Sequence, residues 1–146
     1  MVHGARVIAV ASAKNTDFVL SLGADRVVDY QTAGLEHCAA QVDVVFDTVG
    51  GPNAARLVTT MKCGGRFVTI ARGLPADEQA AAAGITARNL LVRPDAGMLV
   101  EIARRVDEGF LTPQIEKVYP FSETRSAHIH GEAGHVCGKL VLNCPD

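Results

Sequence analysis

Hydrophobic positions along the chain form two alternating patterns, one typical of buried strands and one typical of helices. Continuous apolar runs predict strands at residues 6–11, 26–28, 43–48 and 66–71. Between the first two runs, Phe18, Val19 and Leu22 share one helical face, and Gly23 follows at a position that commonly ends a helix. Strands that are apolar throughout and separated by helices indicate a parallel sheet covered on both faces.

The rest of the chain continues this alternation. Two helical stripes with i, i+3, i+4 and i+7 spacing are formed by Leu35, Cys38, Ala39 and Val42, and by Ala54, Leu57, Val58 and Met61. The later segments predict a loose helix or loop at 76–84, strands at 89–92, 114–119 and 139–143, and helices at 99–109 and 122–130. With right-handed crossovers, the pattern predicts an α/β fold with a doubly wound, Rossmann-like parallel sheet in a single domain.

Composition narrows the functional classes. The chain has 146 residues and a net charge of −2, which gives no electrostatic support for binding nucleic acid or an acidic membrane. No apolar run approaches the ~20 residues of a membrane span, and the N-terminus lacks the layout of a signal peptide. The four cysteines form no CxxC pair, so we expect reduced cysteines in a cytoplasmic protein.

Four stretches in a fixed order carry a family resemblance. Residues 5–30 (ARVIAVASAKNTDFVLSLGADRVVDY), 42–51 (VDVVFDTVGG), 64–71 (GGRFVTIA) and 134–142 (GHVCGKLVL) resemble the coenzyme domain of the medium-chain dehydrogenase/reductase superfamily. The similarity is to its quinone-oxidoreductase-like, zinc-independent branch. It implies NADP(H) as the cofactor, a small-molecule substrate and a homodimer.

The chain departs from the family pattern at its start. The family's N-terminal catalytic domain, the first Rossmann strand and the glycine-rich turn after it have no counterpart in the sequence, which contains no GxGxxG. In the strand order 3-2-1-4-5-6 the first strand is central, so its absence should separate two halves with unpaired edges. We expect a rearranged sheet, strand exchange with a second copy or, preferably, a chain that is part of a longer protein.

The segment after the first predicted strand holds candidate phosphate ligands. NAD-specific folds place an acid at the end of that strand to bind the ribose hydroxyls, but here no acid occurs before Asp17. The side chains of Ser12, Lys14 and Asn15 suit a 2′-phosphate instead, and the resemblance adds Tyr30. The alternative is that Ser12 or Asn15 caps the next helix and that Lys14 is merely solvated.

Further candidate cofactor-binding residues follow the other strands, because ligands of open α/β sheets bind at the carboxyl ends of strands. The resemblance assigns Thr48, Val49 and Gly50 to the adenosine ribose. It assigns Ile70, Ala71 and Arg72 to the nicotinamide ribose, and Leu91 and Val92 to the carboxamide. Lys139 could approach the cofactor from the C-terminal tail. Ordinary strand termination, or a solvated lysine, is the alternative for each.

Three histidines near the C-terminus raise the question of a metal site. His128, His130 and His135 lie within eight residues, but His128 and His130 would point to different sides of a helix. We therefore expect surface histidines and no metal, and the sequence identifies no catalytic residue.

Two functions remain open. The first is the coenzyme-binding portion of an oxidoreductase that reduces quinones, enones or related carbonyl compounds by hydride transfer from NADPH. The alternative is a truncated, non-catalytic module that acts through dimerisation or partner binding, using the predicted strand at 89–92 as an open sheet edge.

Overall fold

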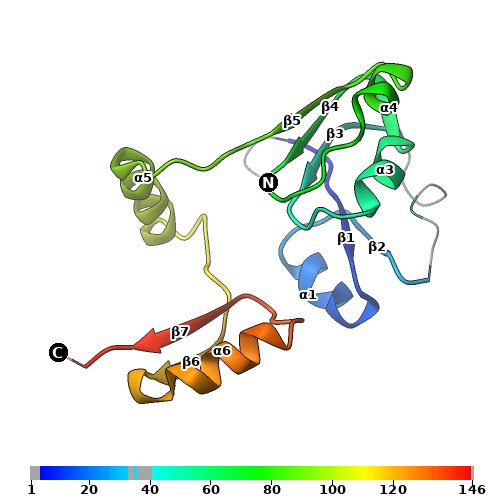
Figure 1. Ribbon diagram of the computed structural model, residues 1–146. Helices are drawn as coiled ribbons and strands as arrows, with labels where there is room; N and C mark the ends of the chain where they lie inside the picture. The colour runs from blue at the N-terminus through cyan, green and yellow to red at the C-terminus, as the bar shows by residue number, and fades with distance from the viewer. Residues whose placement is uncertain (1–3, 33–34, 36–40, 146) are drawn as a thin grey trace. The chain divides into compact units, whose positions relative to one another are not determined.

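The computed structural model describes residues 4–32, 35 and 41–145 (Figure 1). The chain divides into two compact units, residues 1–92 and residues 93–146, and each is described by itself. The sequence analysis predicts a single domain, and this stays a prediction.

The first unit begins with a parallel pair of strands. β1 (Ile8–Ala11) is followed by a 3-10 turn, η1 (Ala13–Asn15), then α1 (Thr16–Ser21) and β2 (Arg26–Asp29), which pairs with β1. Gly23 has φ +97°, which confirms it as the residue that ends the helix.

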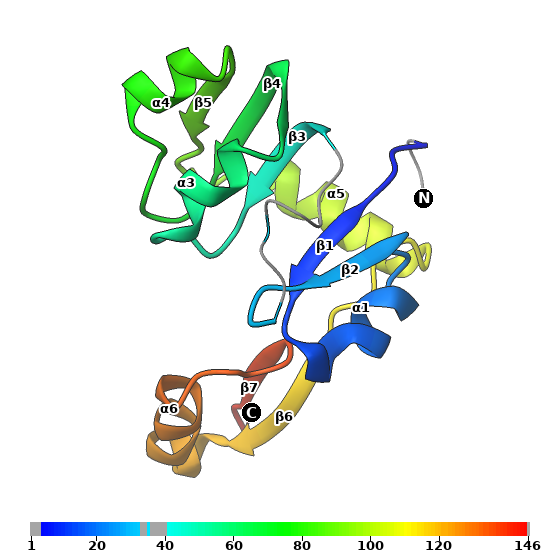
Figure 2. The same cartoon turned by 90° about the vertical axis from the view of Figure 1, so that its right-hand side faces the viewer.

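A three-stranded parallel sheet forms the rest of this unit. Its elements are β3 (Val42–Asp47), α3 (Asn53–Val58), β4 (Met61–Thr69), α4 (Asp77–Ala82) and β5 (Thr86–Asn89), with strand order β3-β4-β5. Both helices lie on one face of the sheet (Figures 1 and 2). Phe67, on the central strand, is fully buried and belongs to the core cluster with Val45, Val58 and Ile85. The core of the unit therefore lies between this sheet and its two helices.

The two sheets of the first unit are not joined. Among the described residues, β1 pairs only with β2, and β3 pairs only with β4. The predicted division of a Rossmann-like sheet at its first strand is therefore confirmed, and each half keeps its parallel pairing without rearrangement.

Several predicted boundaries are wrong. Val42 and Met61, assigned to the ends of helical stripes, each begin a strand, because the apolar helix face runs directly into an apolar strand. Cys38 and Ala39, from the first stripe, lie outside the described residues. The predicted strand at 89–92 is also wrong, since β5 ends at Asn89.

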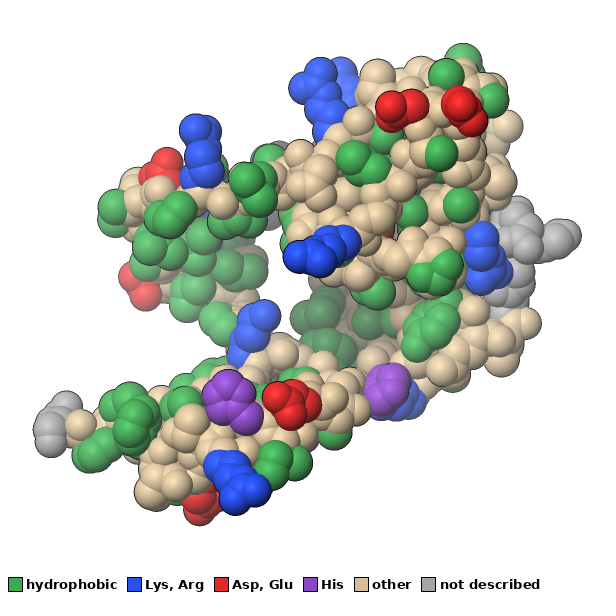
Figure 3. Space-filling model, in the orientation of Figure 1, with side chains coloured by type: hydrophobic (Ala, Val, Ile, Leu, Met, Phe, Trp, Pro, Cys, Tyr) green, Lys and Arg blue, Asp and Glu red, His purple; other side chains and the backbone are tan. Residues whose placement is uncertain are grey.

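The second unit contains one long helix and a strand–helix–strand segment. α5 (Ala96–Asp107) begins where the side chain of Asp95 accepts a hydrogen bond from the amide of Met98, a typical N-cap. After it come β6 (Ile115–Pro120), η2 (Phe121–Glu123), α6 (Thr124–Glu132) and β7 (Lys139–Asn143), with β6 and β7 parallel. Hydrophobic side chains gather on the exposed surface of α5 (Figure 3), among them Met98, Leu99, Val100 and Ile102.

Candidate functional site

The carboxyl ends of three strands are aligned in the first unit. Asp47 of β3 lies in register with Thr69 of β4, and Thr69 lies in register with Asn89 of β5. Three of the predicted groups of cofactor-binding residues follow these strands. The register therefore brings their starting points to one edge of the sheet.

A tight turn follows β3 at this edge. The Asp47 carboxylate accepts hydrogen bonds at Oδ1 from the amides of Val49 (3.0 Å) and Gly50 (2.9 Å). Gly50 has φ +74°, and a Cβ built on it would lie 2.1 Å from the carbonyl oxygen of Arg72. Only glycine fits this backbone without a shift, so the turn that contains Thr48, Val49 and Gly50 is held against the segment after β4.

The segment after β4 is fixed by three further hydrogen bonds. The amide of Gly51 donates to the carbonyl of Arg72 (3.0 Å), and the amide of Ala71 donates to Thr69 Oγ1 (3.0 Å). Asn89 donates from Nδ2 to the carbonyl of Ala71 (2.9 Å). The structure thus joins the predicted group 48–50 to the predicted group 70–72.

Sequence reasoning missed the residues that build this edge. Asp47, Thr69 and Asn89 are the last residues of three strands, and their side chains form the hydrogen bonds that position the turns.

The predicted phosphate ligands lie at the carboxyl ends of β1 and β2. Ala11 and Asp29 are in register, so Ser12 and Tyr30, which follow them, leave the sheet side by side. Lys14 is exposed in the η1 turn. The structure therefore brings Ser12, Lys14, Asn15 and Tyr30 to one edge of this sheet.

The helix-capping alternative for this segment is contradicted. Ser12 precedes η1 and Asn15 precedes α1, but neither side chain forms a capping hydrogen bond. The turn is closed instead by the main chain, where the amide of Asn15 donates to the carbonyl of Ser12 (2.9 Å). Both polar side chains are therefore left available for a ligand.

The remaining predicted residues are less constrained. Leu91 and Val92 follow β5 with 83% and 77% of their surface exposed, and no described strand pairs with them. Lys139 begins β7 in the second unit, where its amide donates to the carbonyl of Gln114 (2.9 Å).

A cavity of about 1150 Å³ lies between β1 and β3 in the first unit. Its wall includes Tyr30 from the end of β2 and the turn formed by Thr48, Val49 and Gly50. The Asp47 carboxylate also borders it, and Asp47 Oδ2 is buried without a hydrogen-bond partner among the described residues. Candidate residues from both sheets thus face one space.

One of the three histidines of the second unit, His130, has structural partners. His130 Nε2 lies 2.9 Å from Glu116 Oε1, and His130 Nδ1 lies 2.8 Å from the hydroxyl of Tyr119. The other oxygen of Glu116 accepts from the amide of Cys137. This chain of contacts ties α6 to β6 and to the segment before β7. Among the described residues, no group of three or more His, Cys, Asp or Glu side chains is placed to hold a metal ion.

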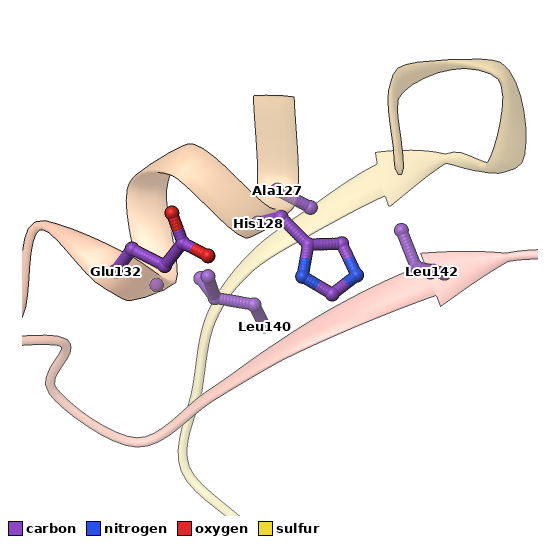
Figure 4. Close-up of a pocket in the computed structure, with 6 residues that line it drawn as sticks. Ala127, His128, Glu132, Leu140 and Leu142 are labelled. Carbon is purple, nitrogen blue, oxygen red and sulfur yellow. The ribbon is translucent and has the colours of Figure 1, made fainter. Parts of the chain in front are cut away.

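His128 lies at a shallow hollow of about 320 Å³ between α6 and β7. Figure 4 shows His128 and Glu132 on the helix, facing Leu140 and Leu142 on the strand. The wall of this hollow contains none of the candidate cofactor-binding residues. This hollow therefore adds nothing to the candidate site.

Comparison with known proteins identifies the family of the chain. The profile of the family described as zinc-binding dehydrogenase matches residues 22–142. The chain belongs to this family. The resemblance to the medium-chain dehydrogenase/reductase superfamily, and with it the Rossmann-like fold, is thereby confirmed.

Individual members of the family show how the match is distributed. The chain is 31% identical to the mitochondrial NAD(P)H oxidoreductase RTN4IP1 of Mus musculus, over 96% of the chain and 42% of that protein. It is 29% identical to the chloroplastic NADPH-dependent alkenal/one oxidoreductase of Arabidopsis thaliana, over 97% and 34%. The quinone oxidoreductase structure from Coxiella burnetii superimposes with a TM-score of 0.82 and 31% identity, over 95% and 45%.

The chain therefore spans less than half the length of the relatives it matches. None of the helices in the described part of the chain is long and apolar enough to cross a membrane.

Proposed function

We propose that this chain is the coenzyme-binding portion of an NADP(H)-dependent oxidoreductase that reduces quinones, enones or related carbonyl compounds by hydride transfer. The observation that carries the proposal is the alignment of strand ends, which gathers the candidate residues at the carboxyl edges of two parallel sheets. Relatives named NAD(P)H, alkenal/one and quinone oxidoreductases support the same reaction class.

The edge of β1 and β2 fits the 2′-phosphate of NADP(H). Lys14 supplies a positive charge, and Ser12, Asn15 and Tyr30 supply neutral hydrogen-bonding groups. Asp29, in register with Ala11, is an acid at this edge, and its carboxylate accepts from the amide of Gln31 and the hydroxyl of Thr32, both at 3.0 Å. It is therefore engaged in its own turn rather than directed at a ribose hydroxyl.

The edge of β3, β4 and β5 fits the rest of the dinucleotide. Gly50 allows the turn to pack against the carbonyl of Arg72, and Thr48 and Val49, beside it, would lie on the adenosine-ribose side. Ile70, Ala71 and Arg72 would contact the nicotinamide ribose, while Leu91 and Val92 would offer main-chain groups to the carboxamide. A role for Lys139, in the second unit, stays a prediction from the sequence. The bound cofactor supplies the hydride, and these residues bind and orient it.

The pyrophosphate has no glycine-rich cradle in this sequence. Each charge-assisted hydrogen bond lost with such a cradle costs about 1.5–3 kcal/mol. We therefore expect weak cofactor binding and very low turnover by this chain alone, with the small-molecule substrate bound largely by other parts of a complete enzyme.

The test is a fluorescence titration with NADPH and with NADH. We expect NADPH to bind more tightly, and Lys14→Ala to weaken NADPH binding at least about tenfold, because it removes a charged phosphate contact. Lys117→Ala is the matched control, since it removes the same charge from the second unit. Equal affinity for the two nucleotides, or an equal loss in both variants, would contradict the proposed phosphate site.

Three further properties belong to this proposal. Chemistry without zinc, a homodimer and a cytoplasmic location are the predictions from the sequence. Relatives named mitochondrial and chloroplastic make the location a separate question. Fractionation of cells that express the chain would decide it.

A second candidate function is a non-catalytic module that acts through dimerisation or partner binding. The open strand edges favour this alternative, because unpaired edges readily accept another strand. No binding of either nucleotide, together with a stable dimer in sizing experiments, would support it.

A further inference from the structure

β1 has no acid at its carboxyl end, but the neighbouring strand has one at the same level. Ala11 ends β1 and Asp29 ends β2, and the two residues are in register. The strands lie side by side (Figure 2), and paired strands are about 4.8 Å apart. NAD-specific folds place their ribose-binding acid at the end of the strand that ends here with Ala11. Asp29 therefore places a carboxylate one strand away from that position.

Both oxygens of the Asp29 carboxylate are engaged. Oδ1 accepts from the amide of Gln31 (3.0 Å), and Oδ2 accepts from the hydroxyl of Thr32 (3.0 Å). Both donors follow the end of β2, so the carboxylate extends beyond the strand toward the edge that holds Ser12 and Tyr30. With one donor on each oxygen, the carboxylate is fixed in its own turn.

The two donors differ in origin. The amide of Gln31 belongs to the main chain, whereas the second donor is the exposed side chain of Thr32. Hydrogen bonds to an ionised acceptor are stronger than those between neutral groups. The side chain at position 32 therefore decides whether the Asp29 carboxylate is held by two hydrogen bonds or by one.

Release of this carboxylate would act in opposite directions on the two nicotinamide nucleotides. A carboxylate that is free to turn can accept hydrogen bonds from the ribose hydroxyls of NADH, which is how acids at strand ends select that nucleotide. The same negative charge repels the 2′-phosphate of NADPH. A carboxylate held in its turn by two donors contributes less to either effect.

We propose that Thr32 is a positioning residue that favours NADPH over NADH by holding the Asp29 carboxylate in the turn after β2. Thr32 acts through Asp29 and need not touch the nucleotide. This inference rests on the proposed function, because it concerns the choice between two nucleotides at the edge of β1 and β2.

The test is a fluorescence titration of the full chain and its variants with NADPH and with NADH. Thr32→Val removes the hydroxyl and nearly keeps the volume of the side chain. We expect the ratio of NADPH affinity to NADH affinity to fall at least about threefold, as suits the loss of one hydrogen bond to a charged group. A purely structural role would weaken both nucleotides equally and leave the ratio unchanged.

Two control variants isolate the hydroxyl and its position. Thr32→Ser keeps a hydroxyl at the same place, so it should keep the affinity ratio. Thr59→Val is the matched remote control, because Thr59 is also exposed and its hydroxyl donates to the carbonyl of Arg56 (2.8 Å), three residues back along the chain. It should leave the ratio unchanged.

A double-mutant comparison tests whether Thr32 acts through Asp29. Asp29→Asn removes the negative charge that the hydroxyl holds. In this background, Thr32→Val should no longer lower the affinity ratio, because no carboxylate is left to release.

Three outcomes would overturn the inference and leave the proposed function standing, provided that the unchanged chain prefers NADPH. They are an unaltered ratio in Thr32→Val, an equal fall of the ratio in Thr32→Ser, and the same fall in the Asp29→Asn background. Equal affinity of the unchanged chain for the two nucleotides, or no binding of either, would overturn both. The two failures are therefore distinguishable.

Discussion

Different kinds of interaction stabilise the first unit and the second unit. Among the described residues, nine buried hydrophobic side chains belong to the first unit, and only Tyr119 and Ala127 belong to the second. The second unit instead has a buried tyrosine linked to His130 and Glu116, and a network of exposed ion pairs along α5. Apolar burial contributes more free energy than exposed ion pairs, so the first unit should be the more stable of the two.

The largest expected effect comes from the core of the first unit. Phe67→Ala removes a side chain that is fully buried in the central strand, and should destabilise this unit by about 3–5 kcal/mol. Hydrogen exchange of the amides in β4, compared with those in β7, would assign the loss to one unit.

Phe46→Ala is the matched control for this prediction. Phe46 lies on the neighbouring strand with 60% of its surface exposed, so its removal should cost less than about 1 kcal/mol. Equal losses for the two variants would show that the three-stranded sheet is not the core of the first unit.

Much of this core could be predicted from the sequence, because strand and helix periodicities depend on local spacing. The last strand, predicted at 139–143, matches β7 to the residue. The strand predicted at 89–92 fails for a non-local reason. β4 ends at Thr69, whose carbonyl accepts from the amide of Leu90, and the ladder of β5 has no further partner beyond that point.

The candidate site shows the same limit. The rule that ligands bind at carboxyl ends of strands locates residues 48–50 and 70–72 without a structure. It gives no indication that Asp47 and Asn89 hold these segments in place. Asp47 accepts from Val49, two residues away, and Asn89 donates to Ala71, 18 residues away along the chain. The link between Tyr119 and His130 is likewise hidden, since it joins a strand to a helix.

An intermediate effect is expected from that link in the second unit. Tyr119→Phe removes the hydroxyl that lies 2.8 Å from His130 Nδ1, at a residue with 4% of its surface exposed. Loss of one buried hydrogen bond should cost about 0.5–1.5 kcal/mol. Hydrogen exchange should show reduced protection in β6 and β7 and unchanged protection in β4.

Tyr30→Phe makes this comparison sharper. Tyr30 is exposed at the predicted phosphate site, so the variant should leave stability unchanged and weaken NADPH binding. Tyr119→Phe should do the reverse. A loss of NADPH affinity in Tyr119→Phe alone would contradict the separation of roles between the two units.

The smallest effect is expected from the ion pairs of α5. Hydrogen bonds from Arg104 and then Arg105 lower the pKa of Glu101 to about 2, from an ordinary value of 4.5, and raise the pKa of Arg104. A carboxyl whose pKa is lower in the folded state stabilises that state above the unfolded pKa, and loses this contribution as the pH falls through the folded value. Glu101 should therefore support α5 fully above about pH 4.5 and progressively less toward pH 2.

Glu101→Gln tests this dependence and, with it, the minor role of exposed charges. Helicity of the variant by circular dichroism should be slightly lower than that of the unchanged chain at pH 7, and the difference should shrink as the pH falls toward 2. Because all four side chains of this network are substantially exposed, 1 M salt should also reduce the difference at pH 7. A difference as large at pH 2 as at pH 7 would mean that the charge of Glu101 is not its cause. A difference that exceeds the effect of Tyr119→Phe would mean that charge pairs rather than the buried tyrosine stabilise the second unit.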